Sequence, residues 1–162
     1  QVAAGGPAFY WASHVGRPRY RVRWRFPSVL TAAEAKSLAS VEEYKGFDAF
    51  AVTPVARLIG SVADVTLAAP SYCRVEGRRE GHPWHCDTGS QGHMAWCRVS
   101  ASVLLTPPDE FTGGGFYFRD APEEPVFHYR DCLVYDDAPE NEHCIAANSG
   151  GRRALIMFFA HA

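Results

Sequence analysis

The close spacing of turn signals in the second half of the chain constrains the fold more than any other feature. From residue 66 onward, short apolar or alternating runs are interrupted by turn-forming segments, among them Glu76-Gly77, Pro107-Pro108, Gly113-Gly114-Gly115 and Ala138-Pro139. Several short strands separated in this way are typical of β-sandwiches and jelly rolls. We therefore expect a β core over residues 66–162.

Two helix starts precede this core. Thr31 and Glu34 have the spacing of a capping box, which predicts a helix that runs to about Ser40. Thr53-Pro54 combines a cap residue with a proline in the first turn, and it predicts a second helix to about Val65. The sequence therefore places helices before the strands.

Arginines alternate with apolar or ring side chains over residues 17–26. This period predicts a strand with one basic face, formed by Arg17, Arg19, Arg21, Arg23 and Arg25. The plainer interpretation is a half-buried strand whose arginines lie in solvent and discourage edge-to-edge pairing. The alternative is a binding strip for an acidic partner or a phosphate backbone.

Charge and hydropathy exclude several classes of protein. Sixteen basic and 18 acidic residues leave a net charge of −2, so we expect no global attraction to nucleic acid or to a membrane. No apolar run approaches the length of a membrane span. A hydrophobic share of 47% argues against disorder. The length of 162 residues suits one domain, 1–162, with the segment 17–65 as helical and strand support for the core.

The cysteines bear on the cellular compartment. Their number is five, which is odd, and no C-x-x-C pair occurs, so neither a disulfide framework nor a thiolate zinc site is expected. This favours an intracellular, reducing compartment such as the cytoplasm or nucleus. Because the first residue is Gln, a removed signal peptide and the secretory pathway stay open as alternatives.

Two histidines and an aspartate form the pattern that carries chemistry. His85 and Asp87 are two residues apart, so on a strand they project to the same face and can reach one metal ion. His143 lies far downstream, after an apolar strand candidate. Two histidines and one carboxylate are the ligands of the facial triad of non-haem iron oxygenases, which leaves coordination positions open for substrate and oxygen. We therefore expect these three residues to converge on one ion.

A basic residue follows His143 on the last strand candidate. Arg153 alternates there with Leu155 and Met157, so if these two residues face the interior, Arg153 does too. A buried guanidinium is costly unless it meets an anion, and a carboxylate can bind it in a bidentate manner. A dicarboxylate that chelates the metal at one end would place its other carboxylate at Arg153.

Together these residues resemble the superfamily of 2-oxoglutarate- and Fe(II)-dependent dioxygenases. The resemblance is greatest to the prolyl 4-hydroxylase and lysyl hydroxylase type, in which a Ser-Val-Leu-Leu strand precedes an acidic-aromatic loop and a Gly-Gly turn. Here Ser102-Val103-Leu104-Leu105 precedes Asp109-Glu110-Phe111 and Gly113-Gly114. The resemblance covers roughly Tyr72 to Phe159. It implies a mainly β fold with N-terminal helices, namely a double-stranded β-helix, which is a distorted jelly roll.

The same resemblance implies the ligands of the site. His85, Asp87 and His143 would bind Fe(II), and Arg153 would pair with the distal carboxylate of the cosubstrate 2-oxoglutarate. Tyr72 and Thr106 are further candidates for contacts with the cosubstrate. O2 is the second cosubstrate, and ascorbate is an optional reductant.

The resemblance also implies an enzyme, a hydroxylase that decarboxylates 2-oxoglutarate to succinate while it hydroxylates a C–H bond. A protein or peptide side chain, such as a prolyl residue, is the first expected substrate, and a small metabolite is the second. Nucleic acid is the third and rests on the arginine strip alone. A cupin-like metal-binding module without oxygen chemistry remains open as a different class. No membrane partner is expected, and the oligomeric state stays open.

Overall fold

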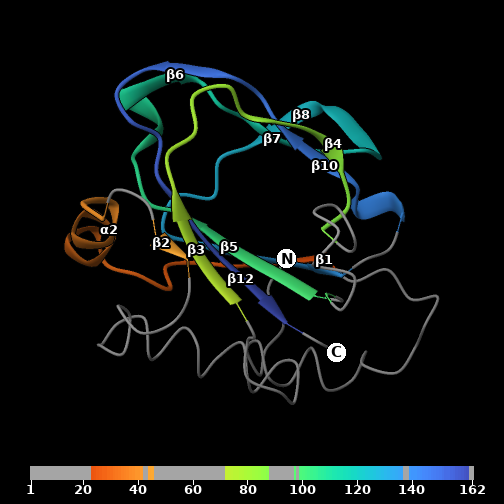
Figure 1. The fold of residues 1–162 in the computed structure, drawn as a ribbon, viewed down its shortest axis with the longest axis horizontal. Coiled ribbons are helices and arrows are strands. Elements are labelled where there is room, and N and C mark those ends of the chain that lie inside the picture. Colours follow the sequence, from red (N-terminus) through yellow and green to blue (C-terminus); the bar gives the residue numbers. More distant parts are fainter. Residues whose placement is uncertain are drawn as a thin grey trace.

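The computed structural model describes residues 23–41, 44–45, 72–87, 97, 99–136 and 139–160. Within these ranges β-strands predominate and pair antiparallel in separate sheets (Figure 1). No helix in the described part of the chain is long and apolar enough to cross a membrane.

A six-stranded sheet, here called the major sheet, forms one layer. Its strand order is β1-β9-β5-β12-β3-β2, so the last strand of the chain lies between strands from its middle. The bounds of the strands, in this order, are Arg23–Phe26, Cys132–Asp136, Val99–Leu104, Leu155–Ala160, Tyr72–Glu76 and Tyr44–Lys45.

A four-stranded sheet, the minor sheet, forms the facing layer, in the order β4-β10-β7-β8. A two-stranded pair, β11 and β6, extends the β structure beside it, and short 3₁₀ turns, η2 and η3, lie in connections (Figure 1). The bounds are His82–His85 for β4, His143–Ile145 for β10, Phe116–Phe118 for β7, Ala121–Val126 for β8, Asn148–Gly150 for β11, Phe111–Gly113 for β6, Pro108–Glu110 for η2 and Pro139–Asn141 for η3.

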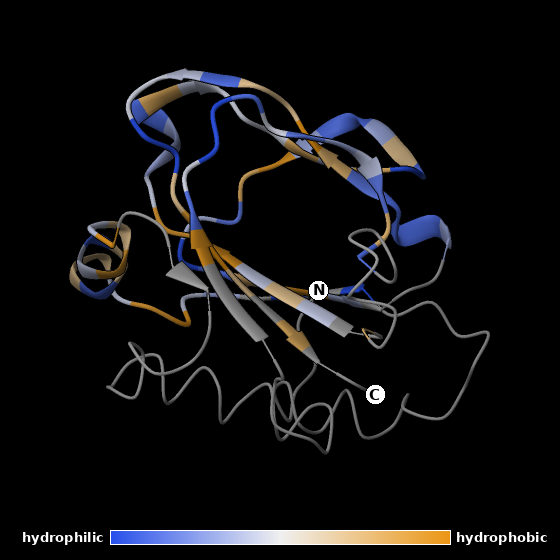
Figure 2. Cartoon of the chain, in the orientation of Figure 1, coloured by the Kyte–Doolittle hydropathy of each residue, from blue (hydrophilic) through white to orange (hydrophobic). Residues whose placement is uncertain are grey.

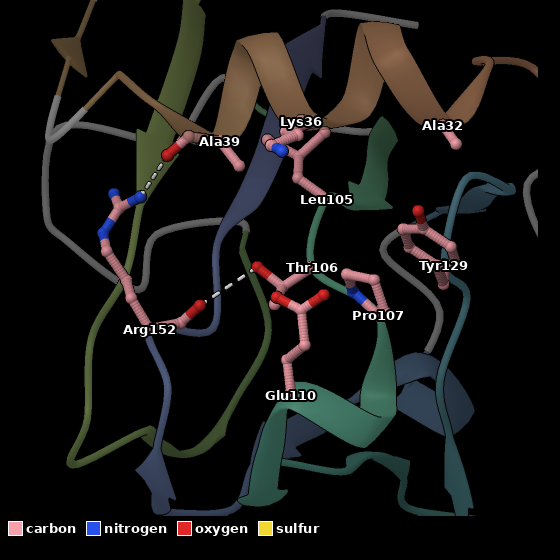
Figure 3. Close-up of a pocket in the computed structure, with 9 residues that line it drawn as sticks. All are labelled: Ala32, Lys36, Ala39, Leu105, Thr106, Pro107, Glu110, Tyr129 and Arg152. Atoms are coloured by element: carbon pink, nitrogen blue, oxygen red, sulfur yellow. Dashed lines mark hydrogen bonds between the residues drawn. The ribbon is translucent and has the colours of Figure 1, made fainter.

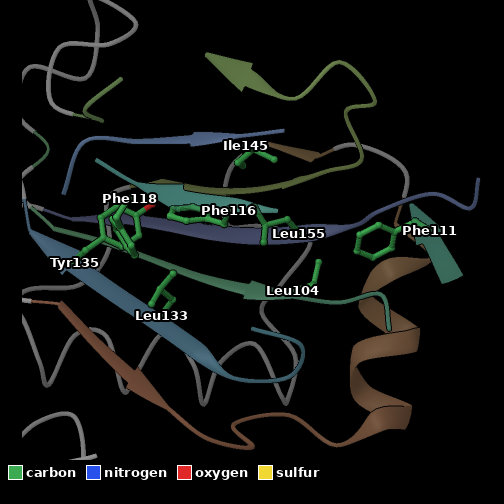
Figure 4. Packing of buried hydrophobic residues seen from close by; sticks show 8 residues of the cluster. All are labelled: Leu104, Phe111, Phe116, Phe118, Leu133, Tyr135, Ile145 and Leu155. Carbon is green, nitrogen blue, oxygen red and sulfur yellow. The ribbon is translucent and has the colours of Figure 1, made fainter. Parts of the chain in front are cut away.

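The hydrophobic core fills the space between these layers. Apolar side chains from both sheets meet there, and Figure 4 shows this cluster, which consists of Leu104, Phe111, Phe116, Phe118, Leu133, Tyr135, Ile145 and Leu155. Figure 2 shows the same division, since apolar residues concentrate on facing strands whereas the connections are more polar. The predicted mainly β fold, a double-stranded β-helix, is confirmed.

Strand β5 is buried on both faces. Ala101 and Val103 are fully buried on one face, while Ser100, Ser102 and Leu104 are buried on the other, which faces the core. Small residues suit a strand that is covered on both sides, and the two serines place hydroxyl groups in the interior between the two sheets. These hydroxyl groups become important for the site.

The predicted capping box at Thr31 is confirmed. The Thr31 hydroxyl accepts a hydrogen bond from the Glu34 backbone N–H, and the Glu34 carboxylate accepts one from the Thr31 backbone N–H. The helix that follows, α2, spans Ala32–Ala39, and Arg152 donates to the carbonyl groups of Ala39 and Val41 at its end. These contacts fix α2 beside the lead-in to β12.

The arginine strip is described in part, because only Arg23 and Arg25 belong to β1. Arg23 forms an ion pair with Asp120 and lies 3.6 Å from the Phe118 ring centroid. Arg25 binds the carboxylate of Asp131 at 2.9 Å. Both arginines therefore bind groups of the chain itself, which differs from arginines that lie freely in solvent.

Some expectations fall outside the described residues. These are the strand over residues 17–22, the helix from Thr53 to Val65, and the first residues of the predicted core, 66–71. The division of a single domain into a support segment and a β core accordingly stays a prediction.

Candidate metal centre

His85, Asp87 and His143 come together as the sequence predicts. The Asp87 Oδ1 atom lies 3.3 Å from His85 Nε2 and 3.4 Å from His143 Nε2. One donor atom from each of the three residues lies within 4.8 Å of the others. Donor atoms bound at right angles to one ion at about 2.1 Å lie about 3 Å apart. The observed separations therefore suit a single metal ion.

Backbone carbonyl groups orient both imidazole rings. His85 Nδ1 lies 2.7 Å from the Pro83 carbonyl oxygen, and His143 Nδ1 lies 2.8 Å from the Asn141 carbonyl oxygen. A carbonyl group accepts only, so each Nδ1 carries the proton and donates. In a neutral ring the Nε2 atom is then left with its lone pair, which is the form that a metal binds.

The carboxylate of Asp87 is held by a residue of the opposite sheet. The Ser100 hydroxyl donates to Asp87 Oδ2 at 2.5 Å, which leaves Oδ1 toward the imidazoles. Burial by itself would raise the pKa of the Asp87 carboxyl. While the imidazoles are protonated, the charge of His143 and hydrogen bonds from His143, His85 and Ser100 hold this pKa well below its usual range. A metal ion bound to the Nε2 atoms would supply the positive charge in place of those protons. Asp87 is therefore a charged oxygen donor.

Aromatic rings surround His143. The Phe116 ring is stacked on the His143 ring, with centroids 4.9 Å apart and an interplanar angle of 13°. The Tyr135 ring meets it edge-on at 4.8 Å. Burial raises the pKa of Tyr135 well above its usual value, and the neighbouring charge of Asp87 raises it further, so its hydroxyl stays protonated. These rings hold His143 in one position and exclude water from one side of the site.

Arg153 is buried, as predicted, with 4% of its surface exposed. Its Nε and Nη2 atoms have no hydrogen-bond partner among the residues that the structure describes. Burial lowers the pKa of Arg153 to about 10, a change that the charge of Glu76 opposes, so the guanidinium is charged at neutral pH. A buried cation with unused donors fits an anionic ligand.

Gly114 leaves the space that Arg153 occupies. Its φ is +73°, and a Cβ atom at this position would lie 2.7 Å from Arg153 Cδ. Arg153 Cζ lies 6.0 Å from the centroid of Phe111, which belongs to the core cluster. The glycine turn that the sequence singles out thus admits the arginine into the interior.

Thr106 binds backbone groups near Arg153. Its hydroxyl donates to the Arg152 carbonyl oxygen at 3.0 Å and accepts from the Ala154 N–H at 2.9 Å. The single hydroxyl proton is therefore engaged, and Thr106 fixes the backbone on both sides of Arg153. Tyr72 begins β3, but its side chain lies outside the described residues.

A pocket of about 480 Å³ lies between α2 and the segment that follows β5. Figure 3 shows its lining, which includes Thr106, Glu110 and Arg152. Neither Arg153 nor any of the three metal-site residues lines it. This pocket is therefore separate from the candidate metal centre.

Sequence reasoning did not find two residues of the site, Ser100 and Tyr135. Both belong to strands of the major sheet and reach the metal site across the core, so no local spacing marks them. Their alternation with buried neighbours does place them on an inward face. Cys86 and Cys144, which neighbour the metal-site residues in the sequence, are half-buried.

The donor set suits iron. Imidazole nitrogen and carboxylate oxygen are ligands of non-haem Fe(II), and three such ligands on one side of an ion leave other positions open. The Arg153 guanidinium, with its unused Nε and Nη2 donors, is buried beside Phe111 of the core cluster. The residues present therefore fit an iron ion together with an anionic ligand that reaches Arg153.

Comparisons with known proteins give the fold an independent test. No family model matches the sequence, and no curated protein matches it. Solved structures do match. A prolyl-4-hydroxylase from Pseudomonas putida has a TM-score of 0.64 and 14% identity over 94% of this chain and 99% of that chain. The viral collagen prolyl hydroxylase of Paramecium Bursaria Chlorella virus-1, in its 2OG complex, has a TM-score of 0.58 and 10% identity over 86% of this chain and 95% of that chain.

A third match is an oxidoreductase of the 2OG-Fe(II) oxygenase family from Burkholderia pseudomallei. Its TM-score is 0.56, with 14% identity over 98% of this chain and 91% of that chain. These likenesses extend over nearly the whole length of each protein. The chain therefore has the fold of the 2-oxoglutarate oxygenases.

Proposed function

We propose that this chain is an Fe(II)- and 2-oxoglutarate-dependent oxygenase that hydroxylates a C–H bond. The observation that carries the proposal is the pairing of two sites in one interior. His85, Asp87 and His143 form a set of metal ligands. Arg153 is buried, and two of its N–H groups have no hydrogen-bond partner among the described residues, so they can bind an anion. A 2-oxo acid with a second carboxylate joins these two chemistries in one molecule.

Each of these side chains has a definite task. The two imidazole Nε2 atoms and Asp87 Oδ1 hold the metal, and the Ser100 hydroxyl keeps the carboxylate turned toward them. Arg153 binds the distal carboxylate and so fixes the orientation of the cosubstrate. The bound iron would supply the redox chemistry that activates O2 while 2-oxoglutarate is decarboxylated to succinate. The aromatic rings around His143 keep this region dry.

A protein or peptide side chain, such as a prolyl residue, is the substrate that we propose first. The support is the fold likeness to proteins described as prolyl hydroxylases. A small metabolite is the second candidate. A nucleic acid has less support, because Arg23 and Arg25 bind Asp120 and Asp131 of the chain itself.

The test is an anaerobic titration of 2-oxoglutarate into the Fe(II)-loaded protein. Chelation of the metal by the 2-oxo acid gives a visible metal-to-ligand charge-transfer band, which needs no knowledge of the substrate. We expect the band to develop and saturate in the unaltered protein. No band at millimolar 2-oxoglutarate would contradict the proposal and favour a metal-binding module of the cupin kind.

Two arginine variants sharpen this test. In Arg153→Ala we expect metal binding to persist and 2-oxoglutarate affinity to fall about 10- to 100-fold, because hydrogen bonds to a charged group are lost. Arg78→Ala is the matched control, since Arg78 is exposed and pairs with Glu80 at the surface, where such pairs contribute little. Equal affinity in the two variants would argue against Arg153 as the carboxylate ligand.

A further inference from the structure

His128 is a buried polar residue that the proposed function does not use. It lies between β8 and β9 and has no exposed surface. Its Nε2 atom lies 2.8 Å from the Ser102 hydroxyl, whereas its Nδ1 atom has no hydrogen-bond partner within the described ranges. An imidazole nitrogen that is buried without a partner destabilises the fold, because it has lost its hydrogen bonds to water. Such a nitrogen points to a ligand that completes its bonding.

The ring of His128 is neutral. Burial, together with the positive charges of Arg153 and Arg25, lowers its pKa to about 3. A neutral imidazole has one N–H donor and one acceptor nitrogen. When the Ser102 hydroxyl donates to Nε2, the ring proton is on Nδ1, which then can donate to an anion. An anion beside Arg153 favours this tautomer.

The position of His128 beside strand β5, relative to the metal centre, suits a contact with the distal carboxylate of the cosubstrate. Ser100 binds the metal-site residue Asp87, and Ser102 follows two residues later on the same face of β5. Two residues of a strand span about 7 Å. Ser102 and His128 thus lie one side-chain layer away from the metal centre. In the next layer Leu104 lies opposite Leu155, the first residue of β12. Arg153 comes two residues before Leu155.

We propose that His128, held by Ser102, donates a hydrogen bond from Nδ1 to the distal carboxylate of the 2-oxo acid and shares that carboxylate with Arg153. The inference rests on the proposed function and deepens it. Arg153, which is charged, and His128, which is neutral, would both donate to the distal carboxylate. They would therefore favour a five-carbon dicarboxylate over 2-oxo acids that lack the second carboxylate. His128 is then a residue of the cosubstrate site that sets its specificity.

Two substitutions separate the two ring nitrogens. In His128→Asn the side-chain amide lies near the original Nδ1 position, so the proposed donor is kept and the Ser102 contact is lost. In His128→Gln the amide reaches toward the original Nε2 position, so the Ser102 contact is kept and the donor is lost. Arg78→Ala serves again as the surface control.

The experiment measures binding, not turnover. The protein is loaded with Mn(II), and the dissociation constants of 2-oxoglutarate and of pyruvate, which lacks the distal carboxylate, are measured by calorimetry. We expect His128→Gln to bind 2-oxoglutarate about tenfold or more weakly and pyruvate unchanged, while His128→Asn loses less. Equal affinities of His128→Gln and the unaltered protein, or an equal loss for both acids, would overturn the assignment.

A second readout needs no variant. In ¹⁵N-labelled, Zn(II)-loaded protein, we expect 2-oxoglutarate to produce a slowly exchanging Nδ1–H signal from His128, and an unchanged imidazole spectrum would overturn the inference. The two proposals also fail differently. If the unaltered protein binds neither acid, the proposed function fails and this inference fails with it. If 2-oxoglutarate binding depends on Arg153 but not on His128, only this inference fails.

Discussion

His85 and His143 lie directly opposite each other on the antiparallel strands β4 and β10, with ring centroids 4.4 Å apart. Residues opposite each other in a sheet project to the same face. Asp87 follows two residues after His85 and completes the group from beyond the end of the strand. A shift of one residue in this strand pair would turn one imidazole to the other face, so the register itself determines whether a metal can bind.

The first prediction concerns metal binding. Asp87→Ala removes the carboxylate between the two imidazoles, and we expect the affinity for Co(II), a coloured substitute for Fe(II), to fall at least about 100-fold, since even indirect partners of ligands contribute 10- to 100-fold. An absorption titration measures this affinity. His82→Gln is the control, because the His82 ring lies only 5.8 Å from that of His85 but binds Glu76. A similar loss in both variants would refute the assigned ligand set.

The second prediction concerns the glycine beside Arg153. Gly114 and Gly150 both have positive φ, +73° and +83°, so alanine at either position costs about 1 kcal/mol of backbone strain. A Cβ atom at Gly114 would collide with Arg153, whereas at Gly150 the nearest atom is 3.6 Å away. We expect Gly150→Ala to lower the stability of the fold but to leave the affinity for 2-oxoglutarate unchanged. Gly114→Ala should lose more stability and also 2-oxoglutarate affinity.

Urea unfolding and the charge-transfer titration measure these two effects. Because the strain is common to both variants, their difference reports the contact with Arg153. If Gly114→Ala bound 2-oxoglutarate as tightly as Gly150→Ala, the position of Arg153 would not matter for the cosubstrate.

The third prediction concerns pH and His128. Its pKa in the folded chain, about 3, lies below the unfolded value near 6.5, so the unfolded chain binds the additional proton between these values. The free energy of unfolding should therefore be highest above pH 6.5 and fall as the pH decreases toward 3, by up to about 1.4 kcal/mol per pH unit from this group.

Urea unfolding at pH 7, 6 and 5 measures this dependence. In His128→Asn, which does not titrate, we expect a flatter profile over the same range. An unchanged slope in the variant would show that His128 does not cause the pH dependence.

The fourth prediction concerns the start of α2. Thr31→Ala removes the hydroxyl that accepts from the Glu34 N–H, and we expect a loss of about 1 kcal/mol in the free energy of unfolding. Ser37→Ala, an exposed position within the same helix, is the control and should change stability by less than about 0.5 kcal/mol. Equal losses, measured from urea unfolding midpoints, would mean that the cap contributes nothing specific.

Local patterns in the sequence predict much of this structure. The two-residue spacing of His85 and Asp87, the capping box at Thr31 and the inward alternation through Arg153 are all properties of short segments. Each is decided by strand or helix periodicity within a few residues. For this reason the shared face of His85 and Asp87 and the burial of Arg153 follow from the sequence.

Contacts between segments that are distant in the sequence could not be predicted in the same way. The bonds from Ser100 to Asp87 and from Ser102 to His128 join segments that are 13 and 26 residues apart. They depend on the order of the strands and on how the layers face each other, which periodicity does not determine. The carboxylate partners of Arg23 and Arg25 are hidden from the sequence for the same reason.

The position of the site between the layers has a mechanical consequence. The two histidines, on β4 and β10, belong to the minor sheet. Ser100 belongs to the major sheet, and Arg153 lies in the segment that precedes β12 of that sheet. A molecule bound to the metal and to Arg153 would therefore link the two sheets, which otherwise contact each other mainly through hydrophobic side chains. Binding of the metal and this molecule should therefore slow amide hydrogen exchange in both sheets together. Without them, each sheet should open locally without the other.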